Sequence, residues 1–216
     1  MGELTIVVNG TSQRELPAER VTVRLRVAAD GPERDPVVNQ VRALHAETTA
    51  QVEQLHDSGA VSWWSSDQLR AWGDRPWSND GAQLPLVHHA AVEVLVRFVD
   101  FTALGQWLTE TAAVDAIAVA GLHWELEEAT TEELTAQVQT AAVHDAVARA
   151  TRYAAALGHE QVEAVEITEP SDLSQPRMMA MSVRDTGGSG GGAAIELRPE
   201  DVTVRASVTA RFRVLV

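Results

Sequence analysis

Apolar and polar residues alternate along several segments, and this pattern predicts the strands. In segment 202–214 every second residue is apolar and the residues between are mostly polar, and segment 21–27 shows the same pattern. A period of two with one polar face is typical of an antiparallel strand that is buried on one side. Further strands are predicted within 4–8, 61–85 (with a hairpin-like excursion), 87–99, 117–126 and 162–168. The pair Asn9-Gly10 predicts a turn after the first strand.

Three segments instead follow the period of an α-helix. The first is predicted from Asp35, as a cap, to Gly59, and the second begins at Asp100. The longest is predicted to open at the capping box Thr130–Glu133 and to end at Gly158. Its expected apolar stripe is Leu134, Val138, Ala142, Val143, Val147, Ala150, Ala154 and Leu157.

These elements predict the α+β class, with a twisted, mainly antiparallel sheet and helices packed on one of its faces. The 216 residues are expected to form a single domain, 1–216. The run of glycine and serine at 187–192 offers no apolar side chain to bury, so a flexible glycine-rich insertion is predicted near 182–196.

Several short motifs occur in the order found in a known family. They are Ile6-Val7-Val8-Asn9-Gly10 with Pro17, Val96-Arg97-Phe98-Val99-Asp100 leading into Leu104-Gly105, strand 117–126, the helix end Ala155-Ala156-Leu157-Gly158, Pro176-Arg177-Met178-Met179-Ala180-Met181 and Pro199-Glu200-Asp201-Val202-Thr203-Val204. Taken together, over nearly the whole chain, they resemble the SIMPL-domain proteins, a bacterial family of largely unknown biochemical function.

The family includes outer-membrane or periplasmic immunogenic proteins. The resemblance implies an α+β fold, a link to envelope or oxidative-stress physiology, and a tendency to self-associate. It implies no catalytic residues. This sequence departs from many members because its first residues do not read as an export signal.

The formal net charge of -14 predicts that the chain as a whole does not bind nucleic acid or anionic lipid. All 17 basic residues are arginine, and the absence of cysteine excludes disulfides and thiolate chemistry. No run reaches the roughly 18 apolar residues of a membrane span. A cytoplasmic protein without a membrane span is therefore expected.

No catalytic or metal-binding pattern stands out. His88 and His89 are neighbours on a predicted strand, so their side chains should point to opposite faces and cannot easily share an ion. The sequence contains neither a Gly-x-Ser-x-Gly elbow nor a phosphate loop. We expect no metal, no cofactor and no enzymatic activity. If the protein were an enzyme, the best acid–base candidates would be His88 or His89 with Glu93.

Two groups of residues are candidates for binding. The first consists of Trp63, Trp64, Trp72 and Trp77, which could cover the end of the sheet, mediate self-association or line a pocket for a small ligand.

The second group consists of the arginines on the polar sides of two strands, namely Arg24, Arg26, Arg205, Arg211 and Arg213. If those strands are neighbours, the arginines form one basic sheet face that could dock an acidic helix of another subunit or an anionic ligand. The alternative is a solvated face with cross-strand pairs to residues such as Glu93.

The function favoured by these observations is a non-enzymatic interaction module that forms a homo-oligomer. It would use the tryptophan segment, the basic sheet face, or both. The alternative is a small-molecule binding protein with a tryptophan-lined pocket.

Overall fold

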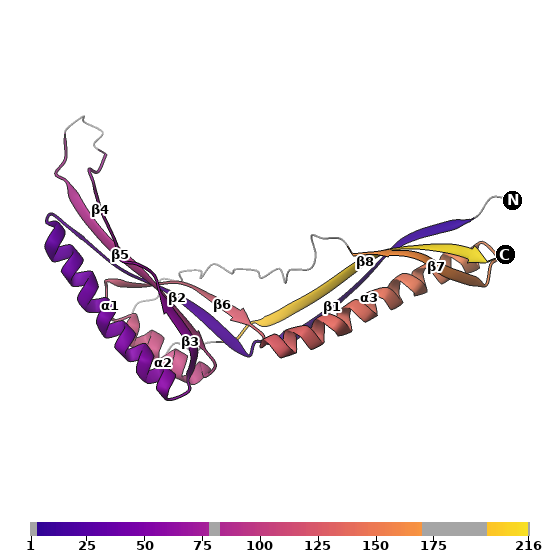
Figure 1. Ribbon diagram of the computed structural model, residues 1–216, viewed down its shortest axis with the longest axis horizontal. Helices are drawn as coiled ribbons and strands as arrows, with labels where there is room; N and C mark the ends of the chain where they lie inside the picture. The colour runs from indigo at the N-terminus through magenta and orange to yellow at the C-terminus, as the bar shows by residue number, and fades with distance from the viewer. Residues whose placement is uncertain (1–3, 78–82, 170–197, 216) are drawn as a thin grey trace. The chain divides into compact units, whose positions relative to one another are not determined.

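The strands of the described residues form two antiparallel sheets, one packed against a single helix and the other against two helices (Figure 1). A computed structural model describes residues 4–77, 83–169 and 198–215, and these contain eight strands and three helices. The predicted α+β class with antiparallel sheets is confirmed.

The described chain divides into two compact units. The first contains residues 4–18, 126–169 and 200–215, and the second contains residues 19–77, 83–125 and 198–199. That the whole chain behaves as one domain stays a prediction. The glycine-rich insertion predicted near 182–196 lies outside the described residues.

The first unit is a three-stranded sheet with one long helix on one face. Its strand order is β1 (Thr5–Pro17), β8 (Asp201–Leu215), β7 (Gln161–Thr168), and helix α3 (Glu128–Ala156) runs along β1 and β8 (Figure 1). The alternation predicted for β8 is confirmed, because Val204, Ala206, Val208, Ala210, Phe212 and Val214 are all buried. Their partners on the helix are Leu134, Val138, Ala142, Ala146, Ala150 and Ala154.

The predicted turn at Asn9-Gly10 is wrong, because β1 continues through both residues. The reason is a close approach between the strand and α3. A Cβ atom on Gly10 would lie 2.0 Å from the carbonyl oxygen of Ala142 and 2.7 Å from the backbone nitrogen of Ala146. Glycine is therefore needed here for contact with a helix far away in the sequence, and not for a turn.

The predicted stripe of α3 is also corrected. Val147 is 40% exposed and Leu157 is 59% exposed, whereas the four alanines of the helix that face the sheet are almost completely buried. Small side chains let the helix approach the strands closely, so alanines occupy the buried face and the larger apolar Val147 and Leu157 lie outside it.

The second unit is a larger sheet whose central strands carry the main core. Its strand order is β3 (Val61–Ser66), β5 (Val87–Phe98), β2 (Arg20–Gly31), β6 (Ile117–Glu125). A further strand, β4 (Arg70–Asp74), pairs with the first half of β5. Helices α1 (Arg34–Asp57) and α2 (Phe101–Thr111) pack on one face (Figure 1). The inward side chains of β2 that the alternation predicted are fully buried, namely Val21, Val23, Leu25 and Val27.

Two of the predicted helix starts are displaced by a residue or more. The Asp35 cap is wrong, because α1 begins at Arg34 with Glu33 as its N-cap, and α3 begins at Glu128, before the predicted capping box. The Asp100 cap is confirmed, since its carboxylate accepts hydrogen bonds from the backbone N–H groups of Thr102 at 2.8 Å and Ala103 at 3.1 Å. The predicted glycine ends of α1 and α3 are confirmed, as Gly59 and Gly158 have positive φ.

Candidate interaction surface

The sheet of the second unit has a face that no helix of this unit covers in the described residues. Because β2 places its odd-numbered residues from Val21 to Val27 in the core, Arg24 and Arg26 project from the opposite face. Cross-strand partners share a face, and Trp63 lies opposite Arg97 while Arg24 lies opposite Leu95. This outer face therefore carries tryptophan and arginine side chains together.

We call the central part of this surface the Trp–Arg face and define it by Trp63, Leu95, Arg97, Arg24 and Arg26. The guanidinium carbon of Arg97 lies 5.2 Å from the centroid of the Trp63 ring, which is a cation–π contact. Trp63 is nevertheless 42% exposed, so its ring also offers apolar area to solvent. Large exposed aromatic rings beside arginine are the composition found at the centres of protein interfaces.

Two arginines of β2, Arg24 and Arg26, make no close ion pair with the described residues. Arg24 stands between Leu95 and Gly121, neither of which carries a charge, and Arg26 stands between Glu93 and Ala118. Among the described residues, no acidic side chain lies within 4.0 Å of either guanidinium group. The Glu93–Arg26 register matches the cross-strand pairing that the sequence allowed, yet no close ion pair forms between them.

A half-buried carboxylate fixes the other end of the Trp–Arg face. Glu125 Oε2 lies 3.4 Å from Arg97 Nε and 3.9 Å from Arg20 Nε, and it accepts a hydrogen bond of 2.8 Å from the hydroxyl of Thr22. These contacts hold Arg97 beneath the Trp63 ring. Arg97 and Glu125 were not among the candidate residues predicted from the sequence, although the two-residue period of strand 87–99 places Arg97 on the same face as Glu93.

The four tryptophans predicted as a cluster do not share one surface. Trp63 and Trp72 lie on the outer face, but their partners on β5 are Arg97 and His89, eight residues apart and therefore about 26 Å along the strand. Trp64 packs against the buried core instead, and Trp77 is 88% exposed and lies after the end of β4.

The five candidate arginines do not form one basic face. Arg205, Arg211 and Arg213 belong to β8, which pairs only with β1 and β7, whereas β2 lies in the other sheet. Arg211 lies 3.5 Å from Glu166 and Arg213 pairs with Glu163, both across the strand on β7. The condition that the strands are neighbours is therefore not met, and two of the β8 arginines are balanced by carboxylates.

The histidine pair behaves as the strand geometry predicts. His89 stacks on Trp72 with ring centroids 5.3 Å apart, and its Nε2 atom lies 3.1 Å from Asp74 Oδ1. His88 lies on the other face of the strand, against Gly73. In the described part of the chain, no group of three or more acidic or histidine side chains could hold a metal ion.

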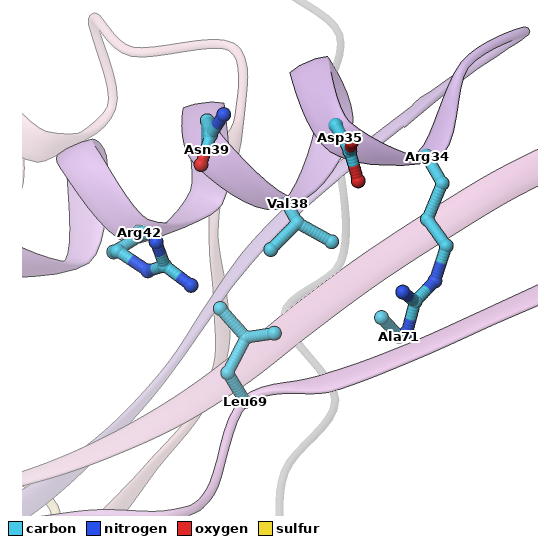
Figure 2. A pocket seen from close by; sticks show the side chains of 7 residues that line it. All are labelled: Arg34, Asp35, Val38, Asn39, Arg42, Leu69 and Ala71. Atoms are coloured by element: carbon cyan, nitrogen blue, oxygen red, sulfur yellow. The ribbon is translucent and has the colours of Figure 1, made fainter.

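A cavity of about 700 Å³ lies beside α1 in the second unit (Figure 2). Its lining residues are Arg34, Asp35, Val38, Asn39, Arg42, Leu69 and Ala71. None of them is a tryptophan, so this cavity is not the tryptophan-lined pocket that the sequence suggested.

The exposed start of α3, in the first unit, carries a row of carboxylates. Glu128 and Glu132 are exposed and stand one helical turn apart, with Glu133 beside them. Among described residues, neither Glu128 nor Glu132 has a basic side chain within 4.0 Å. This surface is acidic, so its charge is opposite to that of the Trp–Arg face.

The comparison with protein families identifies the chain. The SIMPL family model, described as a protein of unknown function (DUF541), matches residues 6–212. The chain therefore belongs to the SIMPL family, as the resemblance of its motifs indicated. No curated protein matches the sequence. Among the described residues, no helix is long and apolar enough to cross a membrane.

Proposed function

We propose that this SIMPL protein is a non-enzymatic assembly module that binds a second copy of itself through the Trp–Arg face. The observation that carries the proposal is the exposed Trp63–Arg97 pair next to Arg24 and Arg26. Among the described residues these two cations have no carboxylate within 4.0 Å, and no described helix of the second unit covers the sheet face that carries them. Tryptophan and arginine are the residues that most often contribute large binding energies at interfaces.

The positive charge of the Trp–Arg face favours binding to an acidic surface of the second copy. Two Trp–Arg faces placed against each other would bring Arg24 and Arg26 close to the same arginines of the other copy, and this repulsion opposes a symmetric contact. A chain with a net charge of -14 instead offers acidic surfaces of its own. The start of α3, with Glu128 and Glu132, is the acidic surface we propose as the partner.

The spacing of the charges supports this choice. Arg24 and Arg26 are two residues apart on a strand, which separates them by about 6.6 Å. Glu128 and Glu132 are four residues apart on a helix, which separates them by about 6 Å along its axis. Two parallel ion pairs can therefore form at once between the strand of one copy and the helix of the next.

Such a contact joins two different surfaces and is therefore head-to-tail. Repeated from copy to copy, it leads to a closed ring or to an open chain of subunits. The link with envelope or oxidative-stress physiology, which the family resemblance implies, stays a prediction beside this proposal.

A pair of charge-reversal variants tests the contact. Variant A carries Arg24→Glu and Arg26→Glu, and variant B carries Glu128→Arg and Glu132→Arg. Each variant alone presents like charges on both surfaces, so each should remain monomeric when its mass is measured by light scattering after size-exclusion chromatography. An equimolar mixture restores opposite charges at every contact and should assemble again.

A mixture of variants A and B that remains monomeric, although both are folded by circular dichroism, would contradict the proposed pairing. A matched control is Arg152→Glu, which reverses an exposed arginine on α3 that lies about 30 Å along the helix from Glu132, and it should leave the mass of the assembly unchanged.

A further inference from the structure

The cavity beside α1 has an arginine at each end and three apolar side chains between them, within a lining that is mostly polar. Figure 2 shows Val38 and Leu69 between Arg42 on one side and Arg34 on the other. Its volume of about 700 Å³ lies within the range of roughly 300–1,000 Å³ that is usual for small-molecule sites. The cavity lies on the side of the sheet that α1 covers, and the Trp–Arg face lies on the opposite side.

The two arginines are exposed and have no carboxylate within 4.0 Å among the described residues. They are eight residues apart on one helix, so their backbones are separated by about 12 Å along its axis. Asn39 lies between them on the wall and adds a neutral amide, and Asp35 is the only acidic side chain among the described residues of the lining. The lining therefore has a net charge of +1, in a protein that is strongly acidic overall.

Three of the lining side chains are apolar because they belong to the outer layer of the core beneath the cavity. Val38, Leu69 and Ala71 pack against the buried cluster of Val27, Val37, Val41, Ala90 and Val92. All three remain only half-buried, so part of their apolar surface faces the cavity. A ligand that covers these three side chains would gain a small free energy, below about 1 kcal/mol, from removing them from water.

We infer that this cavity binds a medium-chain aliphatic dicarboxylate. A guanidinium group pairs with a carboxylate through two parallel hydrogen bonds, and each end of the cavity provides one such group. The methylene chain between the two carboxylates would lie on Val38, Leu69 and Ala71. No reaction is implied, because the ligand is only held.

Calorimetric titration with nonanedioate tests the inference on the full chain. Wild-type protein should bind nonanedioate with a sub-millimolar dissociation constant. Nonanoate, which has one carboxylate fewer, should bind about tenfold more weakly, because one charge-assisted pair is lost. Butanedioate, which is too short to reach both arginines and cover the three apolar side chains, should give no measurable binding.

Substitutions locate the site. The double variant Arg34→Gln and Arg42→Gln should bind nonanedioate at least tenfold more weakly than wild type, whereas the control Arg152→Gln should bind it unchanged. Both replaced side chains are exposed, so the fold should tolerate the change.

Absence of nonanedioate binding to the wild type, or equal binding by the Arg34/Arg42 double variant, would overturn the inference. The assembly proposal has a separate readout, the native mass, which the double variant should leave unchanged. Failure of one idea therefore leaves the other to stand on its own result.

Discussion

Replacing Gly10 with alanine should strongly destabilise the first unit. A Cβ atom at this position would lie 2.0 Å from the carbonyl oxygen of Ala142 and 2.8 Å from the Cβ atom of Ala146. The nearest atom belongs to the helix backbone, which cannot rotate away as a side chain can. Strand β1 and helix α3 would therefore have to separate locally.

The size of the effect follows from that separation. Restoring an ordinary contact of 3.4 Å requires the helix to recede by about 1.4 Å. A gap of roughly 0.5–1 Å already removes a quarter to a half of the dispersion energy of each contact, and the buried alanines of α3 depend on such contacts. Overpacking usually costs about 1–3 kcal/mol, and we expect Gly10→Ala to lie at the upper end, about 3 kcal/mol.

The positions of the tryptophans decide which signal reports on the first unit: fluorescence reports on the second unit, whereas circular dichroism also detects α3. All six tryptophans lie between Trp63 and Trp124 in the second unit, whereas α3, the longest helix, lies in the first. Urea unfolding followed by far-ultraviolet circular dichroism should show the lower stability of Gly10→Ala. The control is Gly121→Ala, because a Cβ atom there meets nothing within 4 Å, and it should be neutral or slightly stabilising.

Two results would contradict direct packing of the α3 backbone on Gly10. A Gly10→Ala variant within about 0.5 kcal/mol of wild type would show that the helix does not pack directly on the strand backbone. Recovery of stability by adding Ala146→Gly would show that the conflict lies with the Ala146 methyl group and not with the backbone of Ala142.

Three further predictions concern named polar contacts. Asp100→Ala removes the cap of α2 and should lower the unfolding free energy by about 1 kcal/mol in urea titrations followed by tryptophan fluorescence. Glu125→Gln leaves Arg97 without its anion and should cost about 1–3 kcal/mol in the same assay. The pKa of Asp145 is lowered from 3.8, first by the hydrogen bond from the Thr11 N–H and then by Arg149. The stabilisation that ionised Asp145 provides is therefore fully present above the unfolded-state pKa and is lost as pH falls through the lower folded-state pKa. Asp145→Asn should make the unfolding free energy, measured by circular dichroism, fall less steeply over this acid range.

The sequence predicted the buried faces of the strands well. The alternation in β8 and β2 records that each strand has one side against helices and one side against water, which is a local property. The Asp100 cap and the glycine ends of two helices are local as well, and they too were found.

Features that depend on distant residues could not be read in this way. Asn9-Gly10 has the composition of a turn, and only the approach of α3 explains why glycine stands inside a strand. Likewise, the alternation that placed arginines on the polar sides of β2 and β8 contains no information about which strands pair. The structure puts those two strands in different sheets.

The candidate surface shows the same division. Trp63 and Trp64 are neighbours in sequence, but consecutive strand residues face opposite sides, so only Trp63 joins the outer face. Arg97 became part of the surface because β3 pairs with β5 in a register that places it beneath Trp63. That register includes an irregularity between Val61 and Trp63, which the residue pattern does not predict.

Self-association through the Trp–Arg face can be measured as the native mass of the wild-type protein, by light scattering at low and at high salt. We expect a mass well above that of the monomer at low salt and dissociation toward the monomer at high salt, because screening weakens the ion pairs of the Trp–Arg face. A monomer at both salt concentrations and at high protein concentration would contradict this self-association.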